Sequence, residues 1–542
     1  MNDSDQTIPL PAAIPAALPQ DIAECHAMIQ ALLLDKAKDR QYIQWLVRKL
    51  FGKKSEKFDP AKYEFFGQPF AETAEEAKAE EAPEAEAETE APEAQAPKKG
   101  HGRRPIPQDL PRTRVEHDVE EGEKVCPDCG AAKVRIGEDV SEVMDYVPAS
   151  FHVIEHVRPK YACKACQGHV VQAPAPERPF DKGLPGAGLV AHVAVCKYCD
   201  HLPLYRLESV FARHGVDLSR KTLCGWMLAL AVLLDPLARA MRQAVLQSAV
   251  INTDDTPVPV QQKGKTHRGY LWVYLGDADH PYTLYDFTWT RGREGPLAFL
   301  EGYEGYLQAD AFSGYDELYV KKPIVEIGCW AHARRYFFEA RESDPVRAHT
   351  AMARIGELYK IEARARELSA DERRALRRQE TVPRLEALRQ WLGENDPQVL
   401  PKSPIAKAIG YATNHWEALT RFPSDGNLAI DNNAAERALR PVCVGRKNWL
   451  FAGSLRGGKA AATIYSVTQS ARRNGLDPFV YLRDVIELLP SSDHRKIAAF
   501  FPDNWKAMRT ATGLAAGQSV TEIASSSEPQ AASPEAPASP DT

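Results

Sequence analysis

The pattern of apolar and polar positions predicts a group of strands in the middle of the chain. An apolar, β-branched run begins at Val250 and leads into Asp254. Because such runs, bounded by turn residues, are typical of strands, we expect a buried strand that ends by presenting the Asp254 carboxylate. Residues 269–275 and 282–287 have the same character and are joined by a turn-like segment. Together the three segments predict a three-stranded meander.

Two more strands are predicted after the meander, with a helix before them. The helix-length stretch 295–302 leads to a strand that ends at Asp310, and residues 323–328 favour one further strand. A crossover helix returns the chain parallel to its starting strand, so the ends of the first and fourth strands can be neighbours in a mixed sheet. This order of elements is the ribonuclease-H-like pattern, within a multidomain α/β chain.

A third acid, Glu436, lies in the segment 431–437, which has the pattern of a helix start. A single Asp at a strand end is usually a turn cap, but three acids in this order indicate a metal-dependent enzyme acting on nucleic acid. Two Mg²⁺ ions about 4 Å apart activate the attacking oxygen and stabilise the leaving one. We expect Asp254 to bridge the ions, and Asp310 and Glu436 to hold one each. Asp255 is expected on the opposite face of the strand, outside this set.

The region between the last strand and Glu436 is far longer than a loop requires. Residues 341–421 are rich in Ala, Leu, Arg and Glu with helical periodicity, which predicts a helical insertion into the catalytic fold. Its arginines suit the holding of DNA, and a bundle that serves only as a scaffold is the alternative. A basic, glycine-containing strip at 454–459 and closing helices at 465–474 and 478–489 are predicted to follow.

Two CxxC pairs lie N-terminal to the strands, 33 residues apart. Four thiolates converging from two such pairs are typical of a closed, tetrahedral structural zinc site, and a redox dithiol is the alternative. The residues between the pairs favour two strands, 140–147 and 153–161, of a zinc ribbon that is too small to fold well without its metal. The predicted zinc ligands are Cys126, Cys129, Cys163 and Cys166.

A third pair, Cys196 and Cys199, has no fourth pair to answer it, and we interpret both as core thiols. Two helices are predicted next, at 204–214 and 219–230, around a short turn with Ser219 as the N-cap. Two helices about such a turn form a candidate DNA-binding helix-turn-helix. Pairs of this kind are also common in helical domains that bind no DNA.

The N-terminal region contains two further candidate interaction segments. Apolar residues at alternating spacings of three and four over 22–50 predict a short coiled coil, either for self-association or for packing on its own domain. A basic arm at 98–105, rich in Gly and Pro, presents Arg103 and Arg104. Such arms can lie in a DNA minor groove, and a solvated stretch that offsets the adjacent acidic linker is the alternative.

Charge and composition refine this picture. The 542-residue chain has a net charge of -6, but residues 71–96 contribute -9 and residues 511–542 contribute -4, so the remainder carries +7. The two acidic segments are rich in Ala, Pro, Ser and Glu and cannot bury enough apolar surface to fold. We expect no membrane-spanning run and no secretory signal, which favours a cytoplasmic, nucleoid-associated protein.

With these motifs in view, the chain resembles the transposases of the bacterial insertion sequence family numbered sixty-six, which are DDE-type enzymes. The resemblance covers nearly everything from about residue 31 to about residue 506. It rests on the four-cysteine ribbon and on the segments 51–57, 200–206, 254–258, 328–335, 430–437 and 446–451. Where the family often has Glu beside the first catalytic Asp, this chain has Asp255.

The resemblance implies the triad Asp254, Asp310 and Glu436, the same acids that the strand pattern selects. It further implies binding of the element's terminal inverted repeats, cleavage at the 3′ ends, and joining of those ends to target DNA. A homo-oligomer and two small accessory proteins of the same element are the implied protein partners. Residues expected to contact DNA, beside those of the arm, are His332, Arg334, Arg335, Arg437, Arg440 and Lys447.

Two alternatives remain: a non-catalytic DNA-binding regulator or domesticated relative, and a plain nuclease of the ribonuclease-H type. The expected order is a helical coiled-coil region (17–70), an acidic linker with the basic arm (71–112), a zinc ribbon (113–178) and a helix-turn-helix-like region (179–244). A catalytic core (245–340 and 425–478) follows, split by the helical insertion (341–424), and then a helical element (479–510). The two ends, 1–16 and 511–542, are expected to be disordered.

Overall fold

The computed structural model describes residues 185–321 and 323–512, together with short stretches between 112 and 174, the pairs 64–65 and 68–69, and the single residues His26 and Lys36. The chain forms two compact units, one comprising residues 54–155 and the other the remainder. The predicted coiled coil, the basic arm with Arg103 and Arg104, and the four predicted zinc ligands lie outside the described residues.

A five-stranded mixed sheet, in the order β7-β6-β5-β8-β9, is the centre of the larger unit. β5, β6 and β7 form an antiparallel meander, whereas β8 runs parallel to β5 and β9 parallel to β8. The five strands are β5(Val250–Gln262), β6(Lys265–Leu275), β7(Thr283–Thr288), β8(Gly305–Gln308) and β9(Ile324–Ile327). Order and direction agree with the prediction, as does the helix α6(Glu294–Phe299) between β7 and β8.

The prediction that the first strand ends at Asp254 is wrong, because β5 continues to Gln262. Pro257 and Pro259 made a strand end plausible, since proline cannot donate to a ladder. Beyond Asn252, however, β5 has left its parallel partner β8, and the Pro259 carbonyl on that side accepts from the Ala452 backbone N–H at 2.8 Å. The missing N–H groups therefore face away from β6, and the β5–β6 ladder stays intact.

Helix α15(Leu455–Arg473) covers the outer edge of the sheet at β7. Two buried α15 hydroxyls accept hydrogen bonds from the strand: Thr283 donates its N–H to Ser470 Oγ at 2.9 Å, and Tyr285 donates to Ser466 Oγ at 2.8 Å. Edge strands otherwise present unpaired backbone groups. These hydrogen bonds explain why the hydroxyls of Ser466 and Ser470 are buried in an otherwise apolar interface. Residues 454–459, part of the predicted basic strip, supply the N-cap and first turn of α15.

The remaining helices of this layer share one hydrophobic core with the sheet, which contains Leu234, Trp272, Val467 and Val485. The predicted helices at 204–214, 219–230 and 478–489 and the predicted helix start in 431–437 are confirmed, although the helix predicted over 219–230 extends to Val245. The helices are α3(Ala187–Tyr198), α4(Leu204–Arg213), α5(Arg220–Val245), α14(Asn433–Trp449), α16(Pro478–Leu488) and α17(Pro502–Thr512).

The pair α4 and α5 forms a helix-turn-helix-like corner. Ser219 caps α5 as predicted, with its side chain accepting from the Thr222 N–H at 3.2 Å. Among the described helices, α5 is the one that is long and apolar enough to cross a membrane by length and composition, which corrects the expectation that no stretch passes this test. One face of α5 packs against α3, α4 and α15, so the helix forms part of the hydrophobic core.

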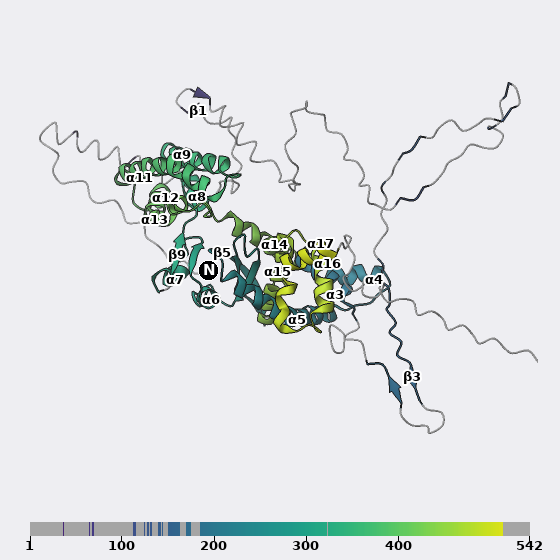
Figure 1. The fold of residues 1–542 in the computed structure, drawn as a ribbon. Helices are drawn as coiled ribbons and strands as arrows, with labels where there is room; N and C mark the ends of the chain where they lie inside the picture. Colours follow the sequence, from purple (N-terminus) through teal and green to yellow (C-terminus); the bar gives the residue numbers. More distant parts are fainter. Residues whose placement is uncertain are drawn as a thin grey trace, which may run out of the picture. The chain divides into compact units, whose positions relative to one another are not determined.

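Every regular element described between Arg341 and Ser424 is helical, and these helices enclose a second core with Trp330, Ile355 and Leu388. Figure 1 shows them gathered with α8 as one group coloured green. They are α8(Trp330–Ala340), α9(Pro345–Arg364), α10(Ala370–Leu376), the π-helical turn η4(Arg377–Thr381), α11(Val382–Asn395), α12(Pro404–Asn414) and α13(Trp416–Leu419), with short 3₁₀ turns η5(Asp396–Gln398) and η6(Phe422–Ser424).

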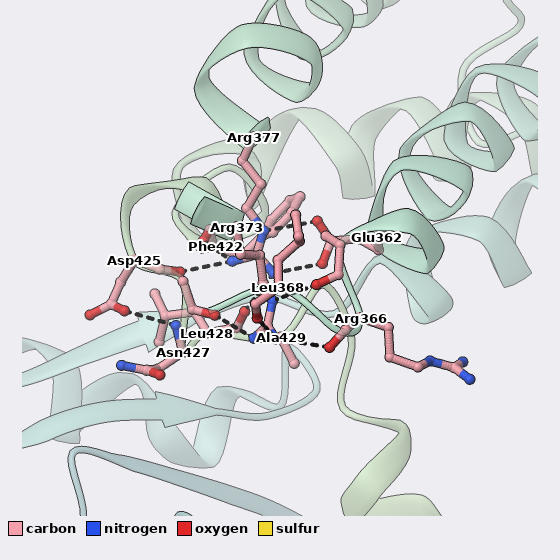
Figure 2. Close-up of polar contacts among 12 residues, drawn as sticks. Glu362, Arg366, Leu368, Arg373, Arg377, Phe422, Asp425, Asn427, Leu428 and Ala429 are labelled. Carbon is pink, nitrogen blue, oxygen red and sulfur yellow. Dashed lines mark hydrogen bonds and ion pairs between the residues drawn. The ribbon is translucent and has the colours of Figure 1, made fainter. Parts of the chain in front are cut away.

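Two arginines attach the loop that leaves this helical group to α9, α10 and η4 (Figure 2). Arg377, only 1% exposed, pairs with Glu362 at 2.6 Å and donates to the carbonyls of Phe422, Asp425 and Leu428. Arg373 donates to the Gly426 carbonyl at 2.8 Å. A Cβ on Gly426 would meet the Ala370 carbonyl oxygen at 1.9 Å, so only glycine fits there. The chain is thereby held in place immediately before α14.

The described residues show a short antiparallel pair, β3(Lys160–Tyr161) with β4(Val171–Gln172), and β3 is the end of the predicted strand 153–161. The prediction of a strand is wrong for 153–159, which have no regular structure. These residues expose apolar side chains, with Val153 93% exposed, so alternation alone did not mark a paired strand here. The β3–β4 pair flanks the second CxxC motif.

Candidate active site

The strand register brings two of the predicted acids to one edge of the sheet. Asn252 of β5 pairs with Gln308 of β8, and Asp254 and Asp310 each lie two residues further along. Asp254 is inside the continuing strand β5, whereas Asp310 is in the loop after β8. The parallel pairing therefore makes these acids neighbours although 55 residues separate them in sequence.

Glu436 reaches this edge from the first turn of α14. The fully buried Asn432 fixes the start of that helix: its amide donates to the Thr253 carbonyl at 2.8 Å and accepts from the Asn252 amide at 3.0 Å. Asn432 makes no side-chain cap for its own helix. Its hydrogen-bonding groups are used instead to join α14 to β5, one residue before Asp254.

A second amide extends this polar network, which sequence reasoning missed. Gln308, 1% exposed, accepts from Asn252 at 3.0 Å and donates to the Ala429 carbonyl at 2.8 Å. Buried amides are stable only when they are hydrogen-bonded, so the three side chains hold β5, β8 and the residues before α14 in a fixed arrangement. The sequence signal for this network was the position of two amides: Asn252 and Gln308 each lie two residues before a predicted acid, Asp254 or Asp310.

Asp254 lies within electrostatic reach of the other two acids. Burial raises the pKa of Asp254 to about 7, and the carboxylates of Asp310, Asp255 and Glu436 contribute in the same direction. The Asp255 backbone N–H, at 2.7 Å from Asp254 Oδ1, opposes the shift. Within the described ranges, no three Asp, Glu, His or Cys side chains converge closely enough to hold a metal as they stand.

Helix α8 supplies His332, whose Nε2 lies 3.8 Å from Glu436 Oε1. The Nδ1 atom of His332 is buried and has no hydrogen-bond partner among the described residues. Cys329 is fully buried, and its Sγ accepts from the Asn432 backbone N–H at 3.2 Å. Burial raises the pKa of Cys329 to about 12. Cys329 therefore has a packing role, whereas the His332 imidazole faces the site.

Asp255 is held by an arginine that the sequence did not mark. Arg291 Nε donates to both Asp255 carboxylate oxygens, at 2.9 and 3.1 Å, and its Nη2 lies 2.8 Å from Oδ1. The same Nη2 is 3.6 Å from Asp310 Oδ2. The guanidinium also lies over the Phe312 ring, 4.1 Å from its centre.

The predicted DNA-contacting residues of the described chain lie on two helices. Arg334 and Arg335 are exposed on α8, and Arg437, Arg440 and Lys447 are exposed on α14. Their neighbour Arg446 turns inward and donates to Thr256 Oγ1 at 2.6 Å, so it has a structural contact. Exposed cations on the helices that carry His332 and Glu436 suit contacts with the phosphates of nucleic acid.

The other acid of this segment, Asp431, is engaged in local contacts. It accepts from the Tyr359 hydroxyl at 2.9 Å, from the Asn433 backbone N–H at 3.1 Å and from the Asn433 amide at 2.9 Å. These bonds favour a structural role for Asp431. Glu436 has no such set of bonds and lies nearer to Asp254.

The donor set at this edge fits a divalent cation with hard ligands. Burial and the neighbouring carboxylates raise the pKa of Asp254, so a charged Asp254 at this edge is costly without a compensating positive charge. Carboxylate oxygens are the ligands that Mg²⁺ and similar cations accept, and Asp254, Asp310 and Glu436 supply them here. The residues present are therefore compatible with the metal that the chemistry requires.

Comparison with known proteins identifies the class as a transposase. Residues 182–460 match the family described as "Transposase IS66 family". Residues 123–167 match the "zinc-finger binding domain of transposase IS66", and residues 40–115 match "Transposase C of IS166 homeodomain". The chain belongs to the IS66 transposase family, and its zinc-finger match supports a structural zinc ion.

Similar proteins occur in Sinorhizobium fredii (strain NBRC 101917 / NGR234). The chain is 34% identical to the uncharacterized protein y4hP over 439 residues, which cover 76% of this chain and 79% of the relative. It is 38% identical to the uncharacterized protein y4qI over 415 residues, which cover 72% and 76% of the two chains. The similarity therefore extends over most of each protein.

Proposed function

We propose that this protein is a DNA transposase that cuts the 3′ ends of its insertion sequence and joins them to target DNA at one two-metal site. The observation that carries the proposal is the shared environment of Asp254, Asp310 and Glu436, which three separate segments bring to one edge of the sheet. The strand order and directions support a ribonuclease-H-like core that the helical group interrupts before its third acid.

Each acid has a specific role in this proposal. Asp254, Asp310 and Glu436 would hold two Mg²⁺ ions, with Asp254 shared between the ions and the other two acids holding one each. The ions, when bound, lower the pKa of a water or 3′-hydroxyl and stabilise the leaving oxygen. Asn252, Gln308 and Asn432 join β5, β8 and the residues before α14, and so hold the backbone positions of the acids. His332 is placed to contact Glu436 or the phosphate.

DNA binding is assigned to several parts of the chain. Zinc held by Cys126, Cys129, Cys163 and Cys166 orders the ribbon, α4 and α5 form a helix-turn-helix, and the exposed arginines on α8 and α14 contact the phosphates of the DNA. The N-terminal helical region is proposed to hold two copies together, because joining two transposon ends requires both in one complex. The domain bounds given from the sequence describe this organisation, and accessory proteins of the same element are further partners.

Replacement of Glu436 by Gln tests the proposal. The change keeps the size of the side chain and removes the charge, so DNA binding in a gel shift should persist while cleavage of a labelled terminal-repeat duplex in Mg²⁺ falls by orders of magnitude. Asp254→Asn and Asp310→Asn should behave alike, and double variants should be no worse, because residues that act as one unit are not additive. Glu417→Gln, at a side chain that is 94% exposed, is the matched control.

The result that overturns the proposal is near-normal cleavage by Glu436→Gln. A wild-type chain that binds the duplex but does not cut it would instead support the alternative, a DNA-binding regulator or domesticated relative.

A further inference from the structure

The Arg291 side chain lies beside the proposed catalytic acids but belongs to none of the elements that carry them. It comes from the loop between β7 and α6, and its contacts are with Asp255, Asp310 and Phe312. Asp255 is only 3% exposed, whereas Arg291 is 39% exposed. The buried Asp255 carboxylate therefore binds one side of the Arg291 guanidinium, and the other side is open to solvent.

The contacts of Arg291 with Asp255 leave some N–H donors of the guanidinium available for another acceptor. Nε and one side of Nη2 are used on Asp255. In the part of the chain that the structure describes, Nη1 donates no hydrogen bond. Arginine presents five N–H donors in a rigid plane, so fixing one edge of the plane also fixes the direction of the remaining donors. Phe312, stacked against the guanidinium, restricts its rotation further.

We propose that Arg291 binds the non-bridging oxygens of the phosphate at which the DNA is cut, and that Asp255 is the positioning residue that aims it. This inference rests on the proposed function. A phosphate approaching Asp254, Asp310 and Glu436 meets three negative charges, and Arg291 is the cation already fixed at 3.6 Å from one of them. The proposal also explains why an acid follows Asp254 although it cannot face the same metal ions.

The competing explanation is that Arg291 only balances the charge of Asp310 and anchors its own loop. The two explanations differ in one respect, which is whether Arg291 senses the charge of the scissile phosphate. Neutralising that single phosphate in the DNA therefore separates them. A terminal-repeat duplex of this element, made with either a normal phosphate or a methylphosphonate at the cleavage position, serves as the probe.

The first measurement is binding of the two duplexes by the full chain in EDTA, where no cleavage occurs. Wild type should bind the charged duplex roughly tenfold more tightly than the neutral one, as expected for a charge-assisted hydrogen bond. Arg291→Ala should bind the two duplexes equally, or the neutral one better, because the acids then repel the phosphate. Arg293→Ala should keep the wild-type preference, since Arg293 lies two residues away and pairs with Glu317 instead.

The second measurement is cleavage of the charged duplex at saturating Mg²⁺. Arg291→Ala should cleave on the order of 100-fold more slowly, the cost of losing a fixed donor to a reacting oxyanion. Arg291→Lys should recover only part of this, because an ammonium cannot hold Asp255 and the phosphate together. Asp255→Asn should slow cleavage less than Arg291→Ala, because the arginine remains but is aimed less well.

Removing Arg291 alone leaves Asp255 buried without its partner, which can unfold the site. The double variant Arg291→Ala/Asp255→Asn contains no such orphaned charge and should show the same loss of phosphate preference and the same slow cleavage. Wild-type preference for the charged duplex in this folded double variant overturns the inference. If Glu436→Gln still abolishes cleavage in that case, the proposed function stands and only the role of Arg291 is wrong.

Discussion

Replacing Arg377 by Met should destabilise the helical group strongly. The guanidinium is almost fully buried, pairs with Glu362 through two hydrogen bonds of 2.8 and 2.6 Å, and satisfies three backbone carbonyls of the 422–428 loop. Methionine fills most of the volume but leaves Glu362 and the carbonyls unpaired. Breaking a buried pair on one side costs about 3 to 5 kcal/mol.

That cost is measurable by thermal and urea unfolding of the purified chain. At about 2 to 4 °C per kcal/mol, the expected decrease in Tm is roughly 6 to 20 °C. The double variant Arg377→Met/Glu362→Gln should recover part of the loss, because no buried charge is then left unpaired. Recovery should be incomplete, since the three carbonyls still lack a donor.

The matched control is Arg378→Met, one residue further along, where the side chain is exposed. A surface change of this kind should alter the free energy of unfolding by no more than about 0.5 kcal/mol. If Arg377→Met and Arg378→Met lower Tm equally, the contacts drawn in Figure 2 do not contribute as described, and the loop before α14 is held by apolar packing instead.

Two further outcomes are expected. The pKa of Asp254 is raised from 3.8 to about 7, so between these pH values the folded chain keeps a proton that the unfolded chain releases. In EDTA, the stability that this group contributes should therefore be full below about pH 4 and lost as the pH rises through about 7. Urea unfolding across that range measures it, and an unchanged slope for Asp254→Asn would contradict the assignment. Chelation of zinc should expose the ribbon thiols to a thiol reagent and unfold residues 113–178; metal analysis that finds no zinc in the purified chain would refute this.

The sheet could be predicted from the sequence because its strands are rich in β-branched and aromatic residues bounded by turns, and because the helix after the meander allows β8 to return parallel beside β5. The end of β5 could not, since Pro257 and Pro259 mark a strand end in local terms. The two prolines are tolerated in β5 because their missing N–H groups lie on the side of the strand opposite β6. The backbone partner on that side is Ala452, far along the chain. A tertiary contact therefore decided a local boundary.

The catalytic roles of Asp254, Asp310 and Glu436 stay predictions, but their positions were predictable because each acid lies in or just after a recognisable element. The groups that hold them were not, because amides such as Asn432 carry no local signal when their partners lie 180 residues away. Arg291 is a similar case: nothing in its loop indicates Asp255, 36 residues earlier. The sequence pattern thus identifies acids in or just after strands and at a helix start, whereas the contacts that arrange them depend on the fold.

The hydrogen bond between Asn252 and Asn432 also limits when the protein can act during its own synthesis. Glu436 is made 126 residues after Asp310. At bacterial elongation rates this separation corresponds to a delay of roughly 6 to 25 seconds. On the proposed mechanism, a nascent chain during this interval lacks both its third acid and the amide that anchors α14. Unfinished or prematurely terminated chains are therefore expected to be unable to cut DNA, even when their sheet has already formed.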